Sequence, residues 1–122
     1  MKKILFIEDE SALQKTLGDT LKKKGYDVIG ALDGESGLRM AKLKKPDLIL
    51  LDLILPKMDG FEVLEKLKED EETKEIPIII LTNLERMQDI EKALELGAKT
   101  FLVKANYTLE EVVEKVKKAL GE

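Results

Sequence analysis

Residues 47–60 read DLILLDLILPKMDG, and they carry the clearest fold signal in the chain. Within it, Leu48–Leu51 is a short, continuous apolar run that ends on Asp52. Such runs, bounded by turn signals, are typical of strands buried on both faces of a parallel sheet. Pro56 and Gly60 then favour a tight connection into a helix. The stretch therefore predicts a buried parallel strand with a carboxylate at its carboxyl end and a helix close behind it.

Three further apolar runs end in the same way, each on a group suited to phosphoryl chemistry. The runs and their closing residues are Ile4–Ile7 with Glu8 and Asp9, Ile78–Leu81 with Thr82, and Phe101–Val103 with Lys104. Ligands of parallel sheets bind at the carboxyl ends of the strands. We therefore expect three acids, one hydroxyl and one amine to converge at one edge of the fold.

Strand and helix patterns alternate along the whole chain. The expected strands are 3–8, 26–31, 47–52, 77–82 and 99–103. The expected helices are 10–24, 34–44, 60–70, 85–96 and a last one that opens at Thr108. Right-handed crossovers then give an α/β fold, a doubly wound, flavodoxin-like (βα)5 sheet of five parallel strands in the order 2-1-3-4-5. Because strands one and three are neighbours in this order, Asp9 is expected beside Asp52.

Two of the helix starts fit the capping box. In this motif the first residue caps the helix and an acid three residues later bonds back to it. Asp59 with Glu62 has this spacing, and so does Thr108 with Glu111. We expect both pairs to fix the starts of their helices.

Length and composition limit the class of protein. At 122 residues the chain is expected to form one domain, 1–122, with its own core. No apolar stretch approaches the roughly 20 residues that a membrane helix needs. Met1–Ile4 leads straight into a strand with no signal-peptide layout, so a cytoplasmic location is expected.

The residue types that are missing exclude several kinds of chemistry. The chain has no Cys and no His, which removes disulfides, thiol chemistry, His-based triads and the usual zinc sites. The net charge is −4, and the only lysine run, Lys22–Lys24, closes a helix, where cations suit the helix dipole. Direct binding of nucleic acid by this domain is therefore disfavoured.

The three acids predict a metal site. Glu8, Asp9 and Asp52 would crowd like charges, which costs free energy unless a cation lies among them. Their hard oxygen ligands suit Mg²⁺. A carboxylate can also act as a nucleophile and form an acyl phosphate. Each of these residues also has a simpler interpretation when taken singly. Glu8–Glu10 fits acids at the start of a helix, where the dipole favours negative charge. Thr82 fits a turn residue at a strand end, and Lys104 fits an ordinary exposed lysine.

Together these positions resemble the receiver domain of bacterial two-component response regulators, over the whole chain. The family's acidic pair falls on Glu8 and Asp9, and its phosphorylated aspartate on Asp52. Its D-x-x-x-P-x-M-D-G loop is intact at residues 52–60. The remaining matches are its switch Thr/Ser at Thr82, its phosphate-binding lysine at Lys104 and its rotating aromatic at Phe101.

The resemblance implies a phosphoacceptor switch rather than an enzyme acting on other molecules. Asp9, Asp52 and the backbone carbonyl of Ile54 would bind Mg²⁺ directly, with Glu8 acting through water. Asp52 would take a phosphoryl group from a histidine kinase or a histidine phosphotransfer protein. Thr82 would then draw toward the phosphate and Phe101 would turn inward. The face of the fourth helix, fifth strand and fifth helix would change and control a downstream protein, as a monomer or a phosphorylation-dependent dimer.

Two of the chain's departures from the family pattern carry predictions. Ala105 follows Lys104 where the family usually has a proline in a cis bond. A cis bond before a non-proline residue costs roughly 2.5–4 kcal/mol, so we predict a trans bond here. Ile54 and Leu84, two residues after Asp52 and Thr82, fall where the family tunes self-hydrolysis. Both are apolar and cannot orient an attacking water, which predicts a slowly hydrolysing aspartyl phosphate.

Three other functions fit parts of the pattern. A haloacid-dehalogenase-like phosphatase also uses an aspartate nucleophile, but it needs a second aspartate at the position of Ile54 and room for a cap domain. An FMN carrier would need a Ser/Thr/Gly-rich loop where Glu8–Glu10 would repel the phosphate. A non-signalling scaffold, natural or designed, would keep the fold without cycling phosphate, and the intact set of acids, threonine and lysine argues against it.

Overall fold

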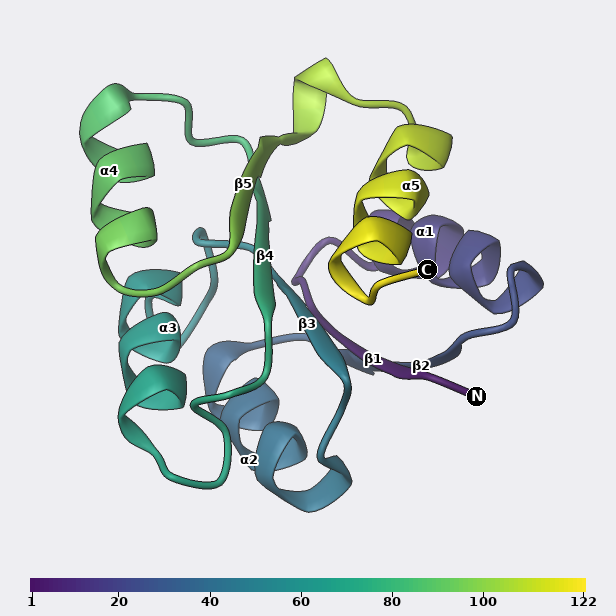
Figure 1. The fold of residues 1–122 in the computed structure, drawn as a ribbon. Helices are drawn as coiled ribbons and strands as arrows, with labels where there is room; N and C mark the ends of the chain where they lie inside the picture. Colours follow the sequence, from purple (N-terminus) through teal and green to yellow (C-terminus); the bar gives the residue numbers. More distant parts are fainter.

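Five parallel strands form a single twisted sheet in the computed structural model, which describes residues 1–122 (Figure 1). Their order across the sheet is β2-β1-β3-β4-β5, as the sequence predicted. The strands are β1 (Lys3–Ile7), β2 (Asp27–Ala31), β3 (Leu48–Leu51), β4 (Ile78–Thr82) and β5 (Thr100–Val103). β1 and β3 are parallel, hydrogen-bonded neighbours, so the carboxyl ends of these two strands lie side by side.

Helices cover both faces of the sheet. They are α1 (Ser11–Lys23), α2 (Gly34–Lys44), α3 (Gly60–Glu69), α4 (Met87–Glu95) and α5 (Leu109–Ala119), with a short 3₁₀ helix, η1 (Lys104–Asn106), after β5. In Figure 1, α1 and α5 lie together on one face, and α2, α3 and α4 lie on the other. None of the helices combines the length and the apolar character needed to cross a membrane. The predicted doubly wound (βα)5 fold is confirmed.

The sheet divides the core into two apolar layers. Side chains alternate along a strand, so Leu5 and Ile7 of β1 pack under α2 and α3, whereas Ile4 and Phe6 pack under α1 and α5. All four side chains are fully buried. Burial on both faces explains why the strands read as continuous apolar runs, and it leaves their carboxyl ends as the polar edge of the sheet.

Two strands stop one residue earlier than the sequence predicted. β1 ends at Ile7 rather than Glu8, and β3 ends at Leu51 rather than Asp52. Each acid keeps a backbone bond to a neighbouring strand: Glu8 N–H donates to Ala31 (2.9 Å) and Asp52 N–H donates to Ile7 (3.0 Å). Both acids are thus held at the edge of the ladder, where the chain turns away.

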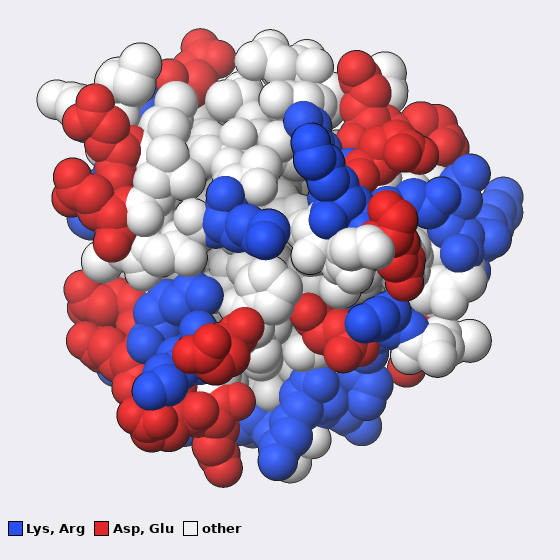
Figure 2. Space-filling model, viewed as in Figure 1, with Lys and Arg blue, Asp and Glu red and all other residues white.

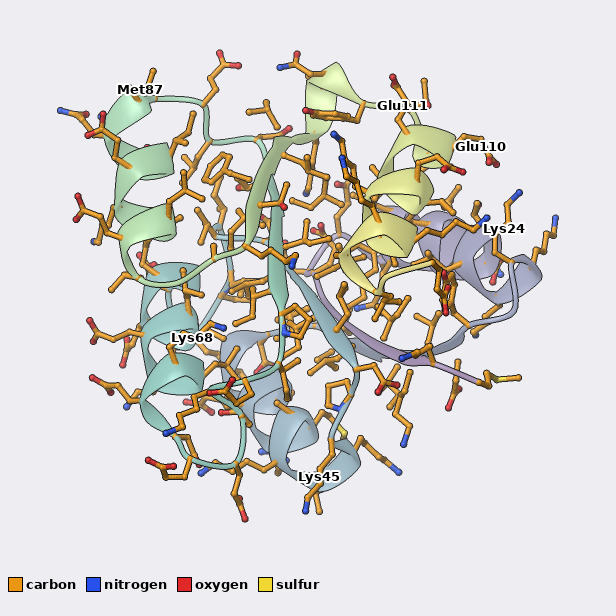
Figure 3. The ribbon with its side chains drawn as sticks, viewed as in Figure 1. Lys24, Lys45, Lys68, Met87, Glu110 and Glu111 are labelled. Atoms are coloured by element: carbon orange, nitrogen blue, oxygen red, sulfur yellow. The ribbon has the colours of Figure 1, made fainter.

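The two predicted capping boxes have different outcomes. At α5, Thr108 accepts a hydrogen bond from Glu111 N–H (3.1 Å), and the Glu111 carboxylate accepts one from Thr108 N–H (2.8 Å) (Figure 3). At α3 the prediction is wrong, because Asp59 accepts from Phe61 N–H (2.7 Å), two residues on, and Glu62 takes no part. Asp59 therefore caps α3 through an Asx turn.

Helix α1 contains a glycine, Gly18, whose replacement by alanine should stabilise the fold. A Cβ on Gly18 would meet only Val28 Cγ1, at an ordinary contact distance of 3.8 Å. Gly18→Ala is expected to raise the free energy of unfolding by about 0.5–1 kcal/mol, because glycine loses more backbone entropy in a helix. Urea unfolding measures the change. Gly37→Ala in α2 is the matched control, since its Cβ would lie 2.5 Å from buried Ile7 and should destabilise instead. Equal losses in both variants would contradict the prediction.

Candidate functional site

Glu8 and Asp52 meet at the carboxyl edge of the sheet because β1 and β3 are paired in register. Ile7 lies opposite Leu51, so the acid that follows each strand lies beside the other. Glu8 is fully buried and Asp52 is 3% exposed, whereas Asp9 is exposed. One carboxylate oxygen from each of the three acids lies within 4.8 Å of the others. The structure therefore brings together the three acids that the sequence predicted at this edge.

Lys104 bridges the two buried acids. Its Nζ lies 2.9 Å from Glu8 Oε1 and 3.0 Å from Asp52 Oδ2, with the exposed Glu10 carboxylate at 3.8 Å. The Lys104 side chain is only 14% exposed. The lysine is therefore placed at the acids even though Ala105 follows it, and the Lys104–Ala105 bond is trans, which confirms that prediction.

Burial and the nearby opposite charge act in opposite directions on the pKa of Glu8 and on that of Lys104. Burial raises the pKa of Glu8 above its ordinary value, and Lys104 only partly offsets this effect. Burial alone would lower the pKa of Lys104, but the carboxylates of Glu8 and Asp52 outweigh it and the pKa is raised. The lysine therefore stays cationic and offsets part of the negative charge of the acids.

The acids suit a hard divalent cation. Glu8 Oε1 is buried, and its close partner is the Lys104 ammonium group at 2.9 Å. One lysine leaves the three clustered carboxylates with an excess of negative charge, which a divalent cation would offset. The donors are all oxygens, with no His or Cys in the chain. This donor set fits Mg²⁺.

The loop after Asp52 is fixed by close backbone packing. Ile54 N–H donates to Asp52 Oδ1 (3.1 Å), and the Ile54 side chain is 53% exposed. Gly60 opens α3 against this segment, where a Cβ would overlap Leu53 Cα and lie 2.5 Å from the Asp52 carbonyl oxygen. The loop can therefore turn into α3 only with glycine at this position, which explains the Gly60 of the sequence motif.

The two predicted switch residues lie on the strands beyond β3. Thr82 is the last residue of β4, is fully buried, and its hydroxyl accepts a long hydrogen bond from Leu84 N–H (3.4 Å). Phe101 lies on β5, is partly buried and packs against the core layer under α2, α3 and α4, as Leu84 does. Thr82 thus ends a strand at the same edge as Asp52, and Phe101 lies one strand further out.

One residue at this edge gives no signal in the sequence. The side-chain amide of Gln14, on α1, donates to backbone carbonyls of β1, of β2 and of Glu8. A glutamine at a half-exposed helix position has no spacing or motif that marks it. Only the folded arrangement of α1 over the ends of β1 and β2 reveals this contact.

Comparisons with known proteins agree with this geometry. A family model described as the response regulator receiver domain matches residues 4–117. The transcriptional regulator RpaA of Synechocystis is 41% identical over 120 residues, which are 98% of this chain and 49% of that protein. The chain spans about half the length of such curated relatives.

Two solved structures show the same fold. A CheY-like receiver domain from Methanospirillum hungatei superposes with a TM-score of 0.92 at 27% identity, over 99% of this chain and 94% of that one. The receiver domain of the sensor histidine kinase PA1611 from Pseudomonas aeruginosa has a TM-score of 0.88 at 29% identity, over 99% and 98% of the two chains. That structure contains a magnesium ion coordinated in its active-site cleft.

Proposed function

The chain belongs to the response regulator receiver domain family, and on this premise we propose that it is a phosphoacceptor switch with Asp52 as the acceptor. The observation that supports this most is the contact of Lys104 with the buried carboxylates of Asp52 and Glu8. A nucleophile, a cation and further acids then share one edge. Transfer of a phosphoryl group needs little more than such positioning and charge neutralisation.

In this proposal the acids hold Mg²⁺ and Asp52 reacts. Asp9, Asp52 and the Ile54 carbonyl would bind the metal, with Glu8 acting through water. When bound, Mg²⁺ supplies positive charge for the phosphoryl oxygens. An Asp52 carboxylate oxygen forms the new bond to phosphorus as the phosphorus–nitrogen bond of a donor phosphohistidine breaks, and the histidine keeps that electron pair. The donor comes from a histidine kinase or a phosphotransfer protein, since this chain has no His.

Lys104 and Thr82 would bind the phosphoryl group once Asp52 carries it. Lys104 is already at Asp52 and would pair with one phosphoryl oxygen, and the Thr82 hydroxyl would bond another. Movement of Thr82 would leave room for Phe101 to turn inward. New charge-assisted bonds of this kind shift the populations of two packings rather than build a new fold.

The output of this shift is the face made by α4, β5 and α5. Figure 2 shows this face with acidic side chains over α4 and near the start of α5, basic ones between them, and uncharged surface separating the charges. Met87 and Leu94 of α4 are 66% and 46% exposed, and Met87 extends to solvent at the start of the helix (Figure 3). A mixed surface with exposed apolar side chains suits a protein partner, or a second copy after phosphorylation, better than nucleic acid.

A small-molecule phosphodonor tests the proposal directly. The protein is incubated with Mg²⁺ and acetyl phosphate and its intact mass is measured. We expect the protein to gain one phosphoryl group. A chelator should suppress this gain, and hydroxylamine, which cleaves acyl phosphates, should release the group. No added group would contradict the proposal, and steady hydrolysis of unrelated phosphate esters would support a phosphatase.

The aspartyl phosphate is expected to hydrolyse slowly. Ile54 is half exposed at the mouth of the site and Leu84 is partly buried, and neither can hydrogen-bond an attacking water. Ile54→Gln is expected to speed loss of the phosphoryl group about tenfold, because its amide can orient that water. The decay is followed by intact mass after the donor is removed. Leu43→Gln, on exposed surface of α2, is the control, and loss within seconds in the unaltered protein would contradict the expectation.

A further inference from the structure

Gln14 ties α1 to β1, which leads into the acidic site, and to the neighbouring strand β2. Its amide nitrogen Nε2 lies 3.0 Å from Ala31 O, 3.1 Å from Glu8 O and 3.3 Å from Phe6 O. The partners are 17, 6 and 8 residues away in the chain. One half-buried side chain thus joins the ends of β1 and β2 to the first turns of α1.

The bonds of Gln14 converge on the backbone of Glu8. The Glu8 carbonyl accepts from Gln14, and the Glu8 N–H donates to the Ala31 carbonyl that Gln14 also contacts. The Glu8 carboxylate in turn accepts from Glu10 N–H at 3.1 Å. The only residues between β1 and α1 are Glu8, Asp9 and Glu10, so Gln14 limits the movement of two of the three clustered acids.

No side-chain cap at the start of α1 duplicates this restraint. Glu10, the N-cap residue of α1, makes no side-chain capping bond, whereas α2, α3 and α5 are each capped by the side chain of the preceding residue. Beside the bond from Glu10 N–H to the Glu8 carboxylate, Gln14 therefore supplies the side-chain bonds between the start of α1 and the strand before it.

The sequence also leaves room for this amide. A Cβ on Gly30 of β2 would lie 2.5 Å from Gln14 Oε1 and 2.6 Å from its Cδ, too close for any real contact. Gly30 has no positive φ that would explain the glycine. The glycine and the glutamine therefore work as a pair, since any larger residue at position 30 would push the amide away from the carbonyls.

We propose that Gln14, seated over Gly30, is a positioning residue that sets the Glu8–Asp9 segment for a divalent cation. The inference rests on the proposed function in one respect, that Mg²⁺ binds at these acids. Groups that orient metal ligands without touching the metal commonly change metal affinity by 10–100-fold. Gln14 acts on the backbone of the ligand segment, so its effect falls on the affinity for Mg²⁺ rather than on the reaction of Asp52.

Gln14→Met removes the donor and keeps the length of the side chain. We expect the Kd for Mg²⁺, measured by calorimetry without any phosphodonor, to rise about tenfold. With acetyl phosphate, the Mg²⁺ concentration for half-maximal rate should rise by the same factor, and the rate at saturating Mg²⁺ should stay within about twofold. Gly30→Ala should raise the Kd for Mg²⁺ by the same factor. The double variant should raise it no further, because both substitutions remove the same contact.

Thr16→Val is the matched control. It also removes a side-chain donor from α1, but Thr16 bonds only to Ala12 within the helix, so Mg²⁺ binding should not change. An unchanged Kd in Gln14→Met would overturn the inference, as would an equal loss of rate at all Mg²⁺ concentrations. Mg²⁺ binding without phosphorylation in the unaltered protein would count against the proposed function alone. No Mg²⁺ binding at all would overturn both.

Discussion

Asp52→Asn is expected to lower phosphoryl incorporation from acetyl phosphate at least about 100-fold, because a neutral amide is a far weaker nucleophile than a carboxylate. The substitution changes the shape of the side chain little. Its Oδ1 can still accept from Ile54 N–H, which now holds Asp52 at 3.1 Å. The loss is therefore expected in a folded protein, and intact mass after incubation with Mg²⁺ measures it.

Asp19→Asn is the control for this experiment. Asp19 is a half-exposed acid on α1 whose partner is Lys15, so the same chemical change should leave phosphorylation intact. Phosphorylation of Asp52→Asn at the rate of the unaltered protein would show that another carboxylate, such as the exposed Asp9 of the same cluster, is the acceptor. That result would overturn the assignment of Asp52 while leaving the metal site in place.

The positions of Asp52, the proposed acceptor, and of its neighbours could be predicted from the sequence because one rule locates them. The carboxyl ends of parallel strands lie at one edge of the sheet, and the last residue of a continuous apolar run indicates where each strand ends. Asp52, Thr82 and Lys104 are therefore found without any structure. The strand order predicted Asp9 beside Asp52, and the structure adds that the register of β1 with β3 puts Glu8 directly beside Asp52, with Asp9 in the same cluster. The rule depends only on burial and topology, which a pattern of apolar residues reports well.

The contacts within the edge could not be predicted in this way. Nothing in the sequence says that Lys104 reaches Glu8 as well as Asp52, because that depends on the path of the loop into η1. Gln14 is a stronger example, since its partners are carbonyl oxygens that every residue has. Asp59 shows the same limit at shorter range, because the Asp-x-x-Glu spacing does not tell an Asx turn from a capping box.

The contacts of Lys104 imply a role in stability as well as in the proposed switch. Its ammonium group is the only cation at the two buried acids in the absence of metal. Breaking a buried ion pair by removing one partner costs more than the pair contributes, because the remaining charges lose their compensation. Lys104 and Mg²⁺ therefore act on the same excess of negative charge, and each should matter most when the other is missing.

Lys104→Met is accordingly expected to lower the free energy of unfolding by about 3 kcal/mol near pH 8 without Mg²⁺. Added Mg²⁺ should restore much of this loss, because it supplies the missing positive charge. Denaturant unfolding with and without the metal measures both effects. Lys99→Met, which removes an exposed lysine just before β5, should change stability little and serves as the control.

The loss of stability in Lys104→Met should also depend on pH, and the protonation of Glu8 determines whether it grows or shrinks as the pH rises. Burial already raises the pKa of Glu8 above 4.5, and removal of Lys104 raises it further. A group whose pKa is raised in the folded state favours folding below its unfolded pKa, and that contribution disappears as the pH rises through the folded pKa. The deficit of Lys104→Met should thus be small near pH 4.5 and grow toward pH 8. Adding Glu8→Gln should remove most of this growth, and a deficit that is the same at every pH would show that Lys104 stabilises the fold by packing rather than by charge.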